Sequence, residues 1–470
     1  MTRFRRAAFL FRRDLRLHDN TGLLEALEAS GEVLPCFVFD PRQLDPTAPW
    51  FARNALLVHL EAIDDLDRQL RPLGARLLRF VGPPEEVAER LVREAGVEAV
   101  FANADHTPFA MRRDALIERR CEEVGAPLLV HADALLHAPG TILTGGRPYR
   151  VFTPYHRAAS QRPVPAPRGL PPEGRLVAPP LPFEAPPGFA AARLPERPLA
   201  VRGGRTEALR AIASLPDHAG YAADRDLPAV DSTRLSAHLK TGAISAREAW
   251  HAVAKALGAD HPLLRQLHWR DFFTQLAFSH PRVFEGAWRR ELDAVAWDEA
   301  PDLLEAWAAG RTGFPIVDAG MRELAATGFM HNRARMITAS FLVKDLHLHW
   351  RHGEQHFARH LVDYDPCVNN GNWQWVASTG ADAQPFFRVF NPWTQGTRFD
   401  PDCAYIKRWV PELAALTSEE IHGLERKRPP GLRYPQPLVD HRTEAREAEA
   451  RFRALESPTR ERPPVEPRRP

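Results

Sequence analysis

The sequence contains little cysteine. Four of its 470 residues are cysteines, and none of them belongs to a C-x-x-C pair. A disulfide framework or a structural zinc site is therefore not expected, and the composition favours the reducing cytoplasm. Long hydrophobic runs are absent too, because the apolar stretch 7–11 stops at Arg12, short of a signal peptide. No run approaches the roughly 20 residues of a membrane span, so we expect no membrane association.

The sequence also has almost no excess charge. Its formal net charge is +2, which does not indicate a nucleic-acid-binding protein, although a local basic surface can still bind DNA. Three motifs of nucleotide-binding proteins and hydrolases are missing: G-x-G-x-x-G after the first expected strand, G-x-x-x-x-G-K-[ST], and G-x-S-x-G. His347 and His349 stand two residues apart and diverge on a helix, so we expect no metal site.

Apolar runs and amphipathic stretches alternate through the first third of the chain. This alternation predicts an α/β domain with a doubly wound parallel sheet and crossover helices. Such sheets bind ligands at the carboxyl ends of their strands. The expected strands lie at 7–11, 33–39, 75–81, 97–103 and 126–132, and the clearest helices at 54–70 and 84–96.

Proline marks the end of this domain. Residues 162–200 are dense in proline, which fixes the backbone and removes a hydrogen-bond donor, so we expect an extended connector instead of a packed element. After residue 205, apolar residues recur at spacings of three and four, which predicts an all-α domain. The polar, Pro/Arg-rich end is typical of disorder. The boundaries that we expect are 1–134 for the α/β domain, 135–204 for the connector, 205–450 for the helical domain and 451–470 for the tail.

Two groups of polar residues in the helical half have two interpretations each. The stretch DSTRLSAHL at 231–239 places hydroxyls and an arginine before an expected helix, where they either cap the helix or hold a phosphate; taken alone, it favours the cap. HWRDFF at 268–273 and FMHNRARM at 329–336 combine aromatic and arginine side chains. These fit a helical core with a solvated face as well as they fit a surface that stacks bases and binds phosphates.

The stretch DYDPCVNNGNWQW at 363–375 is too polar for a core segment and too aromatic for a solvated loop. Most tryptophans in a protein pack in its core. Trp373 and Trp375 differ, because they stand among amides and carboxylates. An indole ring in such surroundings can stack on a planar ligand or carry an electron.

Together these stretches resemble the photolyase/cryptochrome family, most closely its class I cyclobutane pyrimidine dimer DNA photolyases. The resemblance runs from FRRDLRLHDN (11–20) to YPQPLVDHRTEAR (434–446) and is densest at 312–350 and 362–402. It implies an N-terminal antenna domain, a connector, and a C-terminal helical domain that holds one non-covalent FAD. It also implies a monomer that acts on UV-damaged DNA with an extruded pyrimidine dimer.

The resemblance assigns residues around the flavin. It implies that Arg335 and Asp345 form a pair beside the flavin ring, that Asp363 and Asp365 are carboxylates around the flavin and ribose, and that Asn369 faces the reactive nitrogen. It assigns the STRLS segment to the FAD phosphates. The full set of implied cofactor-binding residues is Tyr221, Ser232, Thr233, Arg234, Leu235, Ser236, Gln266, Arg270, Asn332, Arg335, Asp345, Asp363, Asp365 and Asn369.

The resemblance also assigns electron-transfer and DNA-binding residues. A photoreduction chain is implied from Trp373 through Trp350 to Trp297. Together with Asn369 and Gln266, these tryptophans are the implied catalytic residues. The positions that match contacts with the lesion or the DNA strand are Arg225, Trp269, Arg333, Met336, Trp375 and Gln395.

Three activities are open within the family. The favoured one is light-dependent splitting of cyclobutane pyrimidine dimers, in which excited reduced FAD passes an electron to the dimer. Repair of (6-4) photoproducts needs a histidine pair, and the matching Asn332 and Met336 cannot act as acid or base near neutral pH. A cryptochrome photoreceptor is the third alternative; Asn369 matches the repair enzymes instead. Gln266 departs from the glutamate that is usual in dimer photolyases, which leaves the substrate preference open.

A second, antenna chromophore is an optional part of the family's pattern. Folate-binding members have an Asn-Glu pair where this sequence has Phe109 and Ala110. The stretch ADHTPFAMRRD (104–114) is more similar to members that bind a deazaflavin or a second flavin. We therefore expect one of these, or an empty antenna site, instead of folate.

Overall fold

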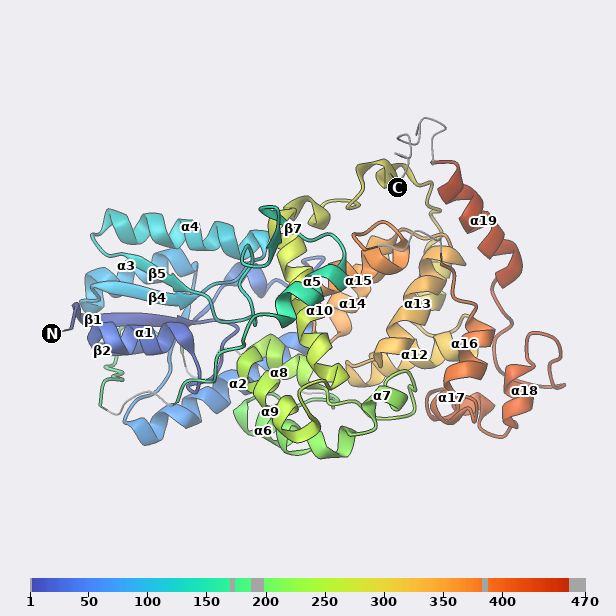
Figure 1. Ribbon diagram of the computed structural model, residues 1–470, viewed down its shortest axis with the longest axis horizontal. Helices are drawn as coiled ribbons and strands as arrows, with labels where there is room; N and C mark the ends of the chain where they lie inside the picture. The colour runs from blue at the N-terminus through green and yellow to red at the C-terminus, as the bar shows by residue number, and fades with distance from the viewer. Residues whose placement is uncertain (1, 170–173, 187–197, 383–387, 456–470) are drawn as a thin grey trace, which may run out of the picture.

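The computed structural model describes residues 2–169, 174–186, 198–382 and 388–455. The N-terminal part, blue and cyan in Figure 1, is an α/β layer structure, and the remainder is a group of packed helices beside it. The predicted fold class, an α/β sheet domain followed by a helical region, is confirmed.

A five-stranded parallel sheet forms the centre of the α/β part. Its strand order is β3-β2-β1-β4-β5. Successive strands are added on one side of β1 up to β3 and on the other side from β4 onward, as in a doubly wound sheet. All five strands were predicted from apolar runs, and they are β1 (Phe4–Phe11), β2 (Ser30–Phe39), β3 (Leu78–Val81), β4 (Ala99–Asn103) and β5 (Leu128–His131).

Helices cover both faces of this sheet (Figure 1). The side chains of α1 and α2 pack with Phe9 and Phe37 on one face, and those of α3 and α4 pack with Leu10 and Leu34 on the other. Burial on both faces explains why the strands are continuously apolar. The bounds are α1 (Thr21–Ala29), α2 (Arg53–Leu70), α3 (Pro84–Ala95) and α4 (Pro108–Glu123), so the helices predicted at 54–70 and 84–96 are confirmed.

The proline-dense connector is packed, which corrects the prediction. Leu176 is 4% exposed, and its neighbours exchange backbone hydrogen bonds with Val33 of β2. Phe183 stacks on Phe80 of β3 with ring centroids 5.1 Å apart. The first part of the predicted connector (135–204) contains the two-residue strands β6 (Leu143–Thr144) and β7 (Arg147–Pro148) and the helix α5 (Phe152–Ser160). Part of the predicted connector, 170–173 and 187–197, lies outside the described residues.

The helical part has one main core and smaller satellites. The core is built chiefly from α12 to α17, with Trp307, Phe341 and Trp350 among its most buried side chains. The helices are α6 (Arg205–Ala213), α7 (Tyr221–Asp224), α8 (Leu235–Thr241), α9 (Ala246–Leu257), α10 (Pro262–Ser279), α11 (Pro301–Ala308), α12 (Pro315–Thr327), α13 (Asn332–Lys344), α14 (Trp350–His360), α15 (Pro366–Ala377), α16 (Pro392–Phe399), α17 (Ala404–Trp409), α18 (Ser418–His422) and α19 (His441–Arg453).

A buried charge cluster joins the two parts. Asp133, after β5, binds Arg16 at 2.6 Å and Arg247 of α9 at 3.0 Å. Arg247 also binds Asp19 at 2.9 Å, and Ser245 donates a hydrogen bond to the same carboxylate. The opposite charges compensate one another away from water. Each part therefore supplies charged side chains that the other part needs for their neutralisation.

The last helix begins before the predicted tail and runs into it. The helix α19 continues to Arg453, three residues past the expected limit at residue 450; residues 456–470 lie outside the described residues. Two charged contacts hold α19 to the turn after α13, His441 to Asp345 at 2.5 Å and His347 to Glu444 at 2.8 Å. Within the described ranges, no helix is long and apolar enough to cross a membrane.

Candidate functional site

The unusual stretch 363–375 comprises the residues that lead into α15 and most of that helix. Asp365 caps this helix, because its carboxylate accepts from the backbone N–H groups of Cys367 and Val368, and Pro366 occupies the first helical position. Gly371 packs against Phe273 of α10, where a Cβ would lie 2.2 Å from the Phe273 ring. The helix therefore approaches α10 closely and places its amides and tryptophans in the interior of the helical part.

Three of the candidate cofactor residues meet at one point. Asp363, before α15, accepts a hydrogen bond from Ser236 of α8 at 2.7 Å and pairs with Arg335 of α13 at 3.0 Å. The Arg335 guanidinium also donates through Nε to the carbonyl of Met330. This junction joins the start of α8, the start of α13 and the segment before α15. Ser236 is exposed, so the junction can be reached from outside.

The helix cap expected from DSTRLSAHL is wrong. α8 begins after Arg234, which has the left-handed φ of 49° and makes no side-chain cap. Asp231, the best capping residue by type, pairs instead with the Arg234 guanidinium at 2.8 Å. Among the described residues, the first N–H groups of α8 therefore have no side-chain acceptor, and they lie beside Arg234 and the exposed Ser236. An uncapped helix start with an arginine and hydroxyls fits the phosphates of a dinucleotide such as FAD.

The expected pair of Arg335 with Asp345 is wrong. Arg335 lies near the start of α13 and Asp345 directly follows its end, so ten residues of helix, about 15 Å, separate them. Arg335 pairs with Asp363, whereas Asp345 pairs with His441 of α19. Burial raises the pKa of Asp345 to about 6. Asp345 thus belongs to the attachment of α19 and not to the junction.

Asp365 lies between the helical part and the sheet. Its carboxylate accepts from the Arg13 guanidinium at 2.5 Å in addition to capping α15. Burial alone would raise the pKa of Asp365, but Arg13, Lys240 and Arg270 together hold it well below its usual range. Arg270 of α10 donates to the carbonyl of Ala134 at 2.6 Å. These residues form a positively charged layer between α8, α10 and the sheet.

Asn369 lies one turn into α15 and is buried. Its Nδ2 donates to the backbone carbonyl of Glu354 in α14 at 3.1 Å, and the neighbouring Asn370 donates to the Glu354 carboxyl at 2.8 Å. With its NH₂ group used in this way, Asn369 is held in one orientation. Burial raises the pKa of Glu354 to about 7, so near neutral pH this carboxyl is partly protonated.

The three tryptophans of the expected chain run from the interior toward the surface. Trp373 is 2% exposed and Trp350 is 1% exposed, whereas Trp297 is only partly buried. The ring of Trp373 packs against Gly353 of α14, one turn after Trp350. His349 lies 5.7 Å from Trp350 and 5.4 Å from Trp297, between ring centroids.

One further tryptophan touches this chain and was not singled out from the sequence. Trp307 of α11 is fully buried, and its ring lies edge-on to Trp373 with centroids 6.3 Å apart. Its indole N–H donates to the carbonyl of Thr338. No sequence motif marks Trp307, because its contact with Trp373 depends on how α11 packs on α15.

The residues matched to the lesion lie on neighbouring helices. Gln266 and Asn332 are exposed at α10 and α13, and Asn332 donates weakly to the Met336 sulfur at 3.7 Å. Trp269 is more enclosed than expected, because two aromatic rings stack on it. The ring centroid of Phe152 in α5 lies 3.5 Å from that of Trp269, and the ring centroid of Phe273 lies 5.3 Å from it. Met336 and Trp375, also matched to the lesion, are partly buried, as is Gln395, which was matched to the DNA strand.

The two arginines matched to the DNA strand differ in their surroundings. Arg225 is exposed at the end of α7. Arg333 is 15% exposed at its side chain and pairs with Asp226 at 2.7 Å. The remaining candidate cofactor residues, Tyr221, Ser232, Thr233 and Leu235, lie on α7 and around the start of α8.

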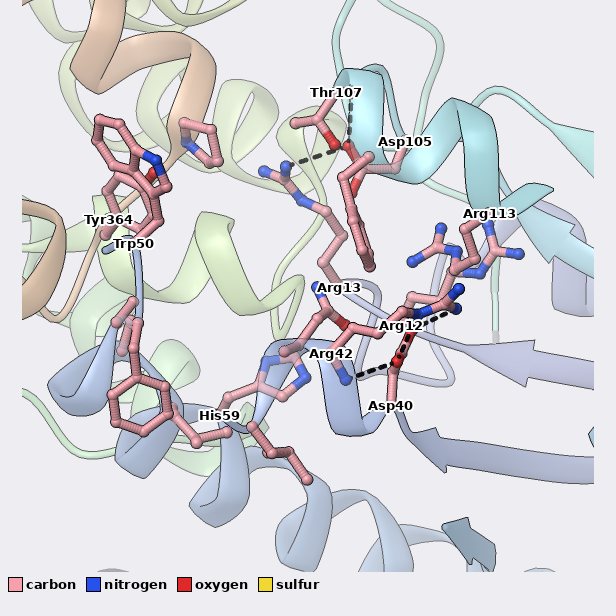
Figure 2. A pocket seen from close by; sticks show the side chains of 18 of the residues that line it. Arg12, Arg13, Asp40, Arg42, Trp50, His59, Asp105, Thr107, Arg113 and Tyr364 are labelled. Carbon is pink, nitrogen blue, oxygen red and sulfur yellow. Dashed lines mark hydrogen bonds and ion pairs between the residues drawn. The ribbon is translucent and has the colours of Figure 1, made fainter. Parts of the chain in front are cut away.

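A large cavity lies at the carboxyl ends of β1, β2 and β4, where the sheet pattern predicted a ligand site. It has a volume of about 590 Å³ and lies between the sheet and the helical part, as Figure 2 shows. Phe109 and Tyr364 line it, together with several arginines. Two of these arginines, Arg112 and Arg113, lie in the stretch 104–114 that the resemblance related to an antenna site, whereas no motif related Arg42 or Arg351 to it. The arginines that line the cavity are Arg12, Arg13, Arg42, Arg112, Arg113 and Arg351.

The cavity wall has unsatisfied hydrogen-bond donors. Arg12 Nη2, Arg13 Nε and Arg113 Nη2 are buried and have no hydrogen-bond partner in the part of the chain that the structure describes. Burial and the nearby cations Lys240 and Arg13 lower the pKa of His59 to about 3, so this lining imidazole is neutral. Such donors suit a ligand with anionic groups. Among the described residues, no group of three or more His, Cys, Asp or Glu side chains could hold a metal.

Comparisons with known protein families cover most of the chain. Residues 7–172 match the family model described as DNA photolyase, and residues 263–454 match the model described as FAD binding domain of DNA photolyase. A deoxyribodipyrimidine photo-lyase from Agrobacterium fabrum is 37% identical over 96% of this chain and 98% of that protein. A cryptochrome DASH from Gloeobacter violaceus is 37% identical over 92% of both.

Solved structures agree with these sequence matches. An archaeal photolyase from Sulfolobus tokodaii, described with two FAD molecules, is 40% identical, has a TM-score of 0.87, and is matched over 96% of this chain and 100% of that one. A bacterial class III photolyase from Agrobacterium tumefaciens is 35% identical with a TM-score of 0.88, over 97% and 98% of the two chains. The chain described above therefore belongs to the DNA photolyase family.

Proposed function

We propose that this chain is a deoxyribodipyrimidine photo-lyase, which uses FAD and light to split cyclobutane pyrimidine dimers in UV-damaged DNA. The observation that carries the proposal is the junction of Ser236, Arg335 and Asp363 beside the uncapped start of α8. It stands in a chain that aligns over nearly its whole length with proteins named photo-lyase.

The residues around the junction have separate roles in holding FAD. The segment from Ser232 to Ser236 would bind the phosphates through hydroxyls and the free N–H groups of α8. The ion pair of Arg335 and Asp363 would lie beside the flavin, and the fixed amide of Asn369 would present its oxygen toward it. When bound in its reduced form, FAD supplies the light-driven electron that opens the dimer's cyclobutane ring.

The tryptophans would keep that cofactor reduced. Trp373 is buried on α15 with Asn369, one turn away on the same helix, and would be the nearest electron donor to the flavin. Trp350 and Trp297 would pass the electron inward from the surface. The surrounding core excludes water, which keeps the charge-bearing rings in a low-dielectric environment.

The DNA side of the proposal uses exposed residues. Gln266, Met336 and Trp375 would contact an extruded dimer, whose extrusion costs a few kcal/mol and is least for damaged bases. Arg225, Arg333 and Gln395 would follow the strand. The contact of Asn332 with the Met336 sulfur contains no group that could shuttle a proton, which favours dimers over (6-4) photoproducts. We further propose a monomer with the domain limits 1–134 and 205–450, α19 extending past the second limit.

The cavity at the sheet edge is proposed to hold a second chromophore. The arginines that line it favour a ligand with phosphates, and therefore a flavin nucleotide, over a deazaflavin without phosphates. Folate is disfavoured because Phe109 lines the wall where an amide or carboxylate is needed. The photolyase with two FAD molecules is a precedent among similar structures.

One experiment tests the whole proposal. Purified protein is heat-denatured, the released flavin is counted per chain, and intact protein is illuminated with an oligonucleotide that contains one thymine dimer. We expect about one FAD per chain, more if the cavity is filled, and dimer loss that depends on light. A preparation without flavin that cannot be reconstituted would refute the cofactor assignment, and flavoprotein that never splits dimers would point to a photoreceptor.

A further inference from the structure

Arg333 is the most restrained of the basic side chains on the proposed DNA surface. Its Nη2 lies 2.7 Å from an Asp226 carboxylate oxygen, and its guanidinium carbon lies 4.2 Å above the centre of the Phe399 ring in α16. Its Nε is buried and has no hydrogen-bond partner among the described residues. The guanidinium is therefore held in place by one carboxylate and one aromatic face while one of its donors stays unused.

The carboxylate that holds it is open to solvent. Asp226 lies just after α7, its side chain is 40% exposed, and it follows the exposed Arg225. A carboxylate and a phosphate bind a guanidinium in the same way, through charge-assisted N–H···O hydrogen bonds. Asp226 thus occupies on Arg333 the position that a DNA phosphate would take.

The exchange of these two anions is close to balanced. Asp226 is the more exposed member of the pair, so water and salt can compensate it when it leaves, while a phosphate would take over the compensation of the more buried Arg333. Leaving would also let Arg333 expose its unused Nε. Phe399 stays below the guanidinium and also lies 5.0 Å from Arg398, so the basic surface keeps its aromatic support.

We propose that Asp226 is an internal competitor for the phosphate site on Arg333, and that it limits the affinity of the protein for DNA. This inference rests on the proposed function, because it takes Arg333 as a residue that contacts DNA. The effect of Asp226 is on phosphate binding, so it applies to damaged and undamaged strands alike.

The test is a double-mutant cycle on DNA binding in the dark. Duplexes with and without one thymine dimer are titrated at several salt concentrations with wild type, Asp226→Asn, Arg333→Ala and the double variant. Glu425→Gln, an exposed residue in another part of the helical region, changes the net charge equally and serves as the control. Flavin content and melting temperature show that each variant is folded, and Asp226→Ser repeats the test with a second side chain.

We expect Asp226→Asn to bind both duplexes about two- to fivefold more tightly than wild type, and Glu425→Gln to bind as wild type does. In the Arg333→Ala background the gain should largely disappear, because no guanidinium is left to release. Unchanged or weaker binding by Asp226→Asn would overturn the inference, as would an equal gain in both backgrounds. Failure of the proposed function looks different: the dimer would then give no tighter binding than the undamaged duplex, while the cycle on undamaged DNA still reports on Asp226.

Discussion

Arg13 and Asp365, 352 residues apart in the chain, form an ion pair with 2.5 Å between Nη2 and Oδ2. Arg13 lies two residues after the first strand of the sheet, and Asp365 caps the helix that carries Asn369 and Trp373. The pair therefore fixes the candidate flavin helix to the wall of the sheet-edge cavity.

Breaking this pair should be costly. Arg13→Gln leaves a buried carboxylate without its main partner, so we expect the free energy of unfolding to fall by about 3–5 kcal/mol. Arg311→Gln is the control: Arg311 pairs with Glu305 at 2.9 Å and both side chains are exposed, so its loss should cost less than about 1 kcal/mol. Urea denaturation followed by tryptophan fluorescence measures both. Equal losses would mean that burial does not distinguish the two pairs.

Substitutions at two aspartates should have different effects, one on flavin binding and the other on thermal stability. Asp363→Asn weakens the contacts with Arg335 and Ser236, and we expect the purified protein to retain less than about a tenth of its FAD, since such charge-assisted bonds contribute roughly 1.5–3 kcal/mol each. Asp345→Asn should keep the flavin and lower the melting temperature, because it loosens α19 at His441. Flavin absorbance per chain and thermal unfolding measure the two effects. The reverse result would restore Asp345 to the flavin site.

The tryptophan chain is tested by photoreduction. Trp373→Phe should lower the rate at which light reduces oxidised FAD by at least about tenfold, because the nearest donor is lost while the ring still fills the space between α14 and α15. Enzyme that is reduced beforehand should still repair dimers. Trp307→Phe is the control, since Trp307 is equally buried and touches Trp373 but lies outside the proposed route. If Trp307→Phe has the larger effect, electrons enter through α11.

Gln266 should make dimer repair insensitive to pH. Its amide donates a hydrogen bond at any pH and never adds negative charge beside the dimer's radical anion, so we expect a nearly flat rate from about pH 6 to 9. Gln266→Ala should cost roughly tenfold, and Gln266→Glu should make repair fall as the carboxyl ionises. Single-turnover repair by reduced enzyme measures this. Repair by Gln266→Ala at the wild-type rate would leave Gln266 with a structural role alone.

Glu354 should make stability depend on pH. Burial raises its pKa to about 7, so between its ordinary value and pH 7 the folded protein holds a proton that the unfolded chain has lost. Stability therefore falls as pH rises through this window, by about 3 kcal/mol at most, and levels off above pH 7. Glu354→Gln keeps the hydrogen bond from Asn370 and removes this part of the fall. The control Glu305→Gln, at an exposed residue, should retain it. Identical pH profiles for Glu354→Gln and wild type would exclude a shifted Glu354.

The sheet and the long helices follow from the sequence because their apolar periodicity is strong. Each strand that the apolar runs predicted is present, and α2 and α3 end within one residue of their predicted limits. The packing of the connector could not be predicted in this way. Proline density restricts the backbone, but it does not indicate that Leu176 and Phe183 pack against the sheet.

Within the site, local motifs were a poorer guide than helix geometry. DSTRLS has the composition of a cap, yet Arg234 adopts a left-handed conformation that leaves the helix start open. Arg335 and Asp345 are close in sequence but lie at opposite ends of α13. The pairs that do form, such as Arg335 with Asp363, depend on how separate helices pack against each other. No local sequence pattern specifies that packing.

The packed connector has a consequence for synthesis on the ribosome. The edge of β2 and the two faces of the sheet are complete only once Leu176 and Phe183 have emerged, and Asp19 and Asp133 remain without Arg247 until α9 has been made. The nascent α/β layer should therefore stay incomplete until more than half of the chain has left the exit tunnel. A gene cut after residue 204 would yield a fragment in which the buried Asp19 lacks its ion pair with Arg247 and Asp133 keeps only Arg16, and such a fragment should be a substrate for proteases and chaperones.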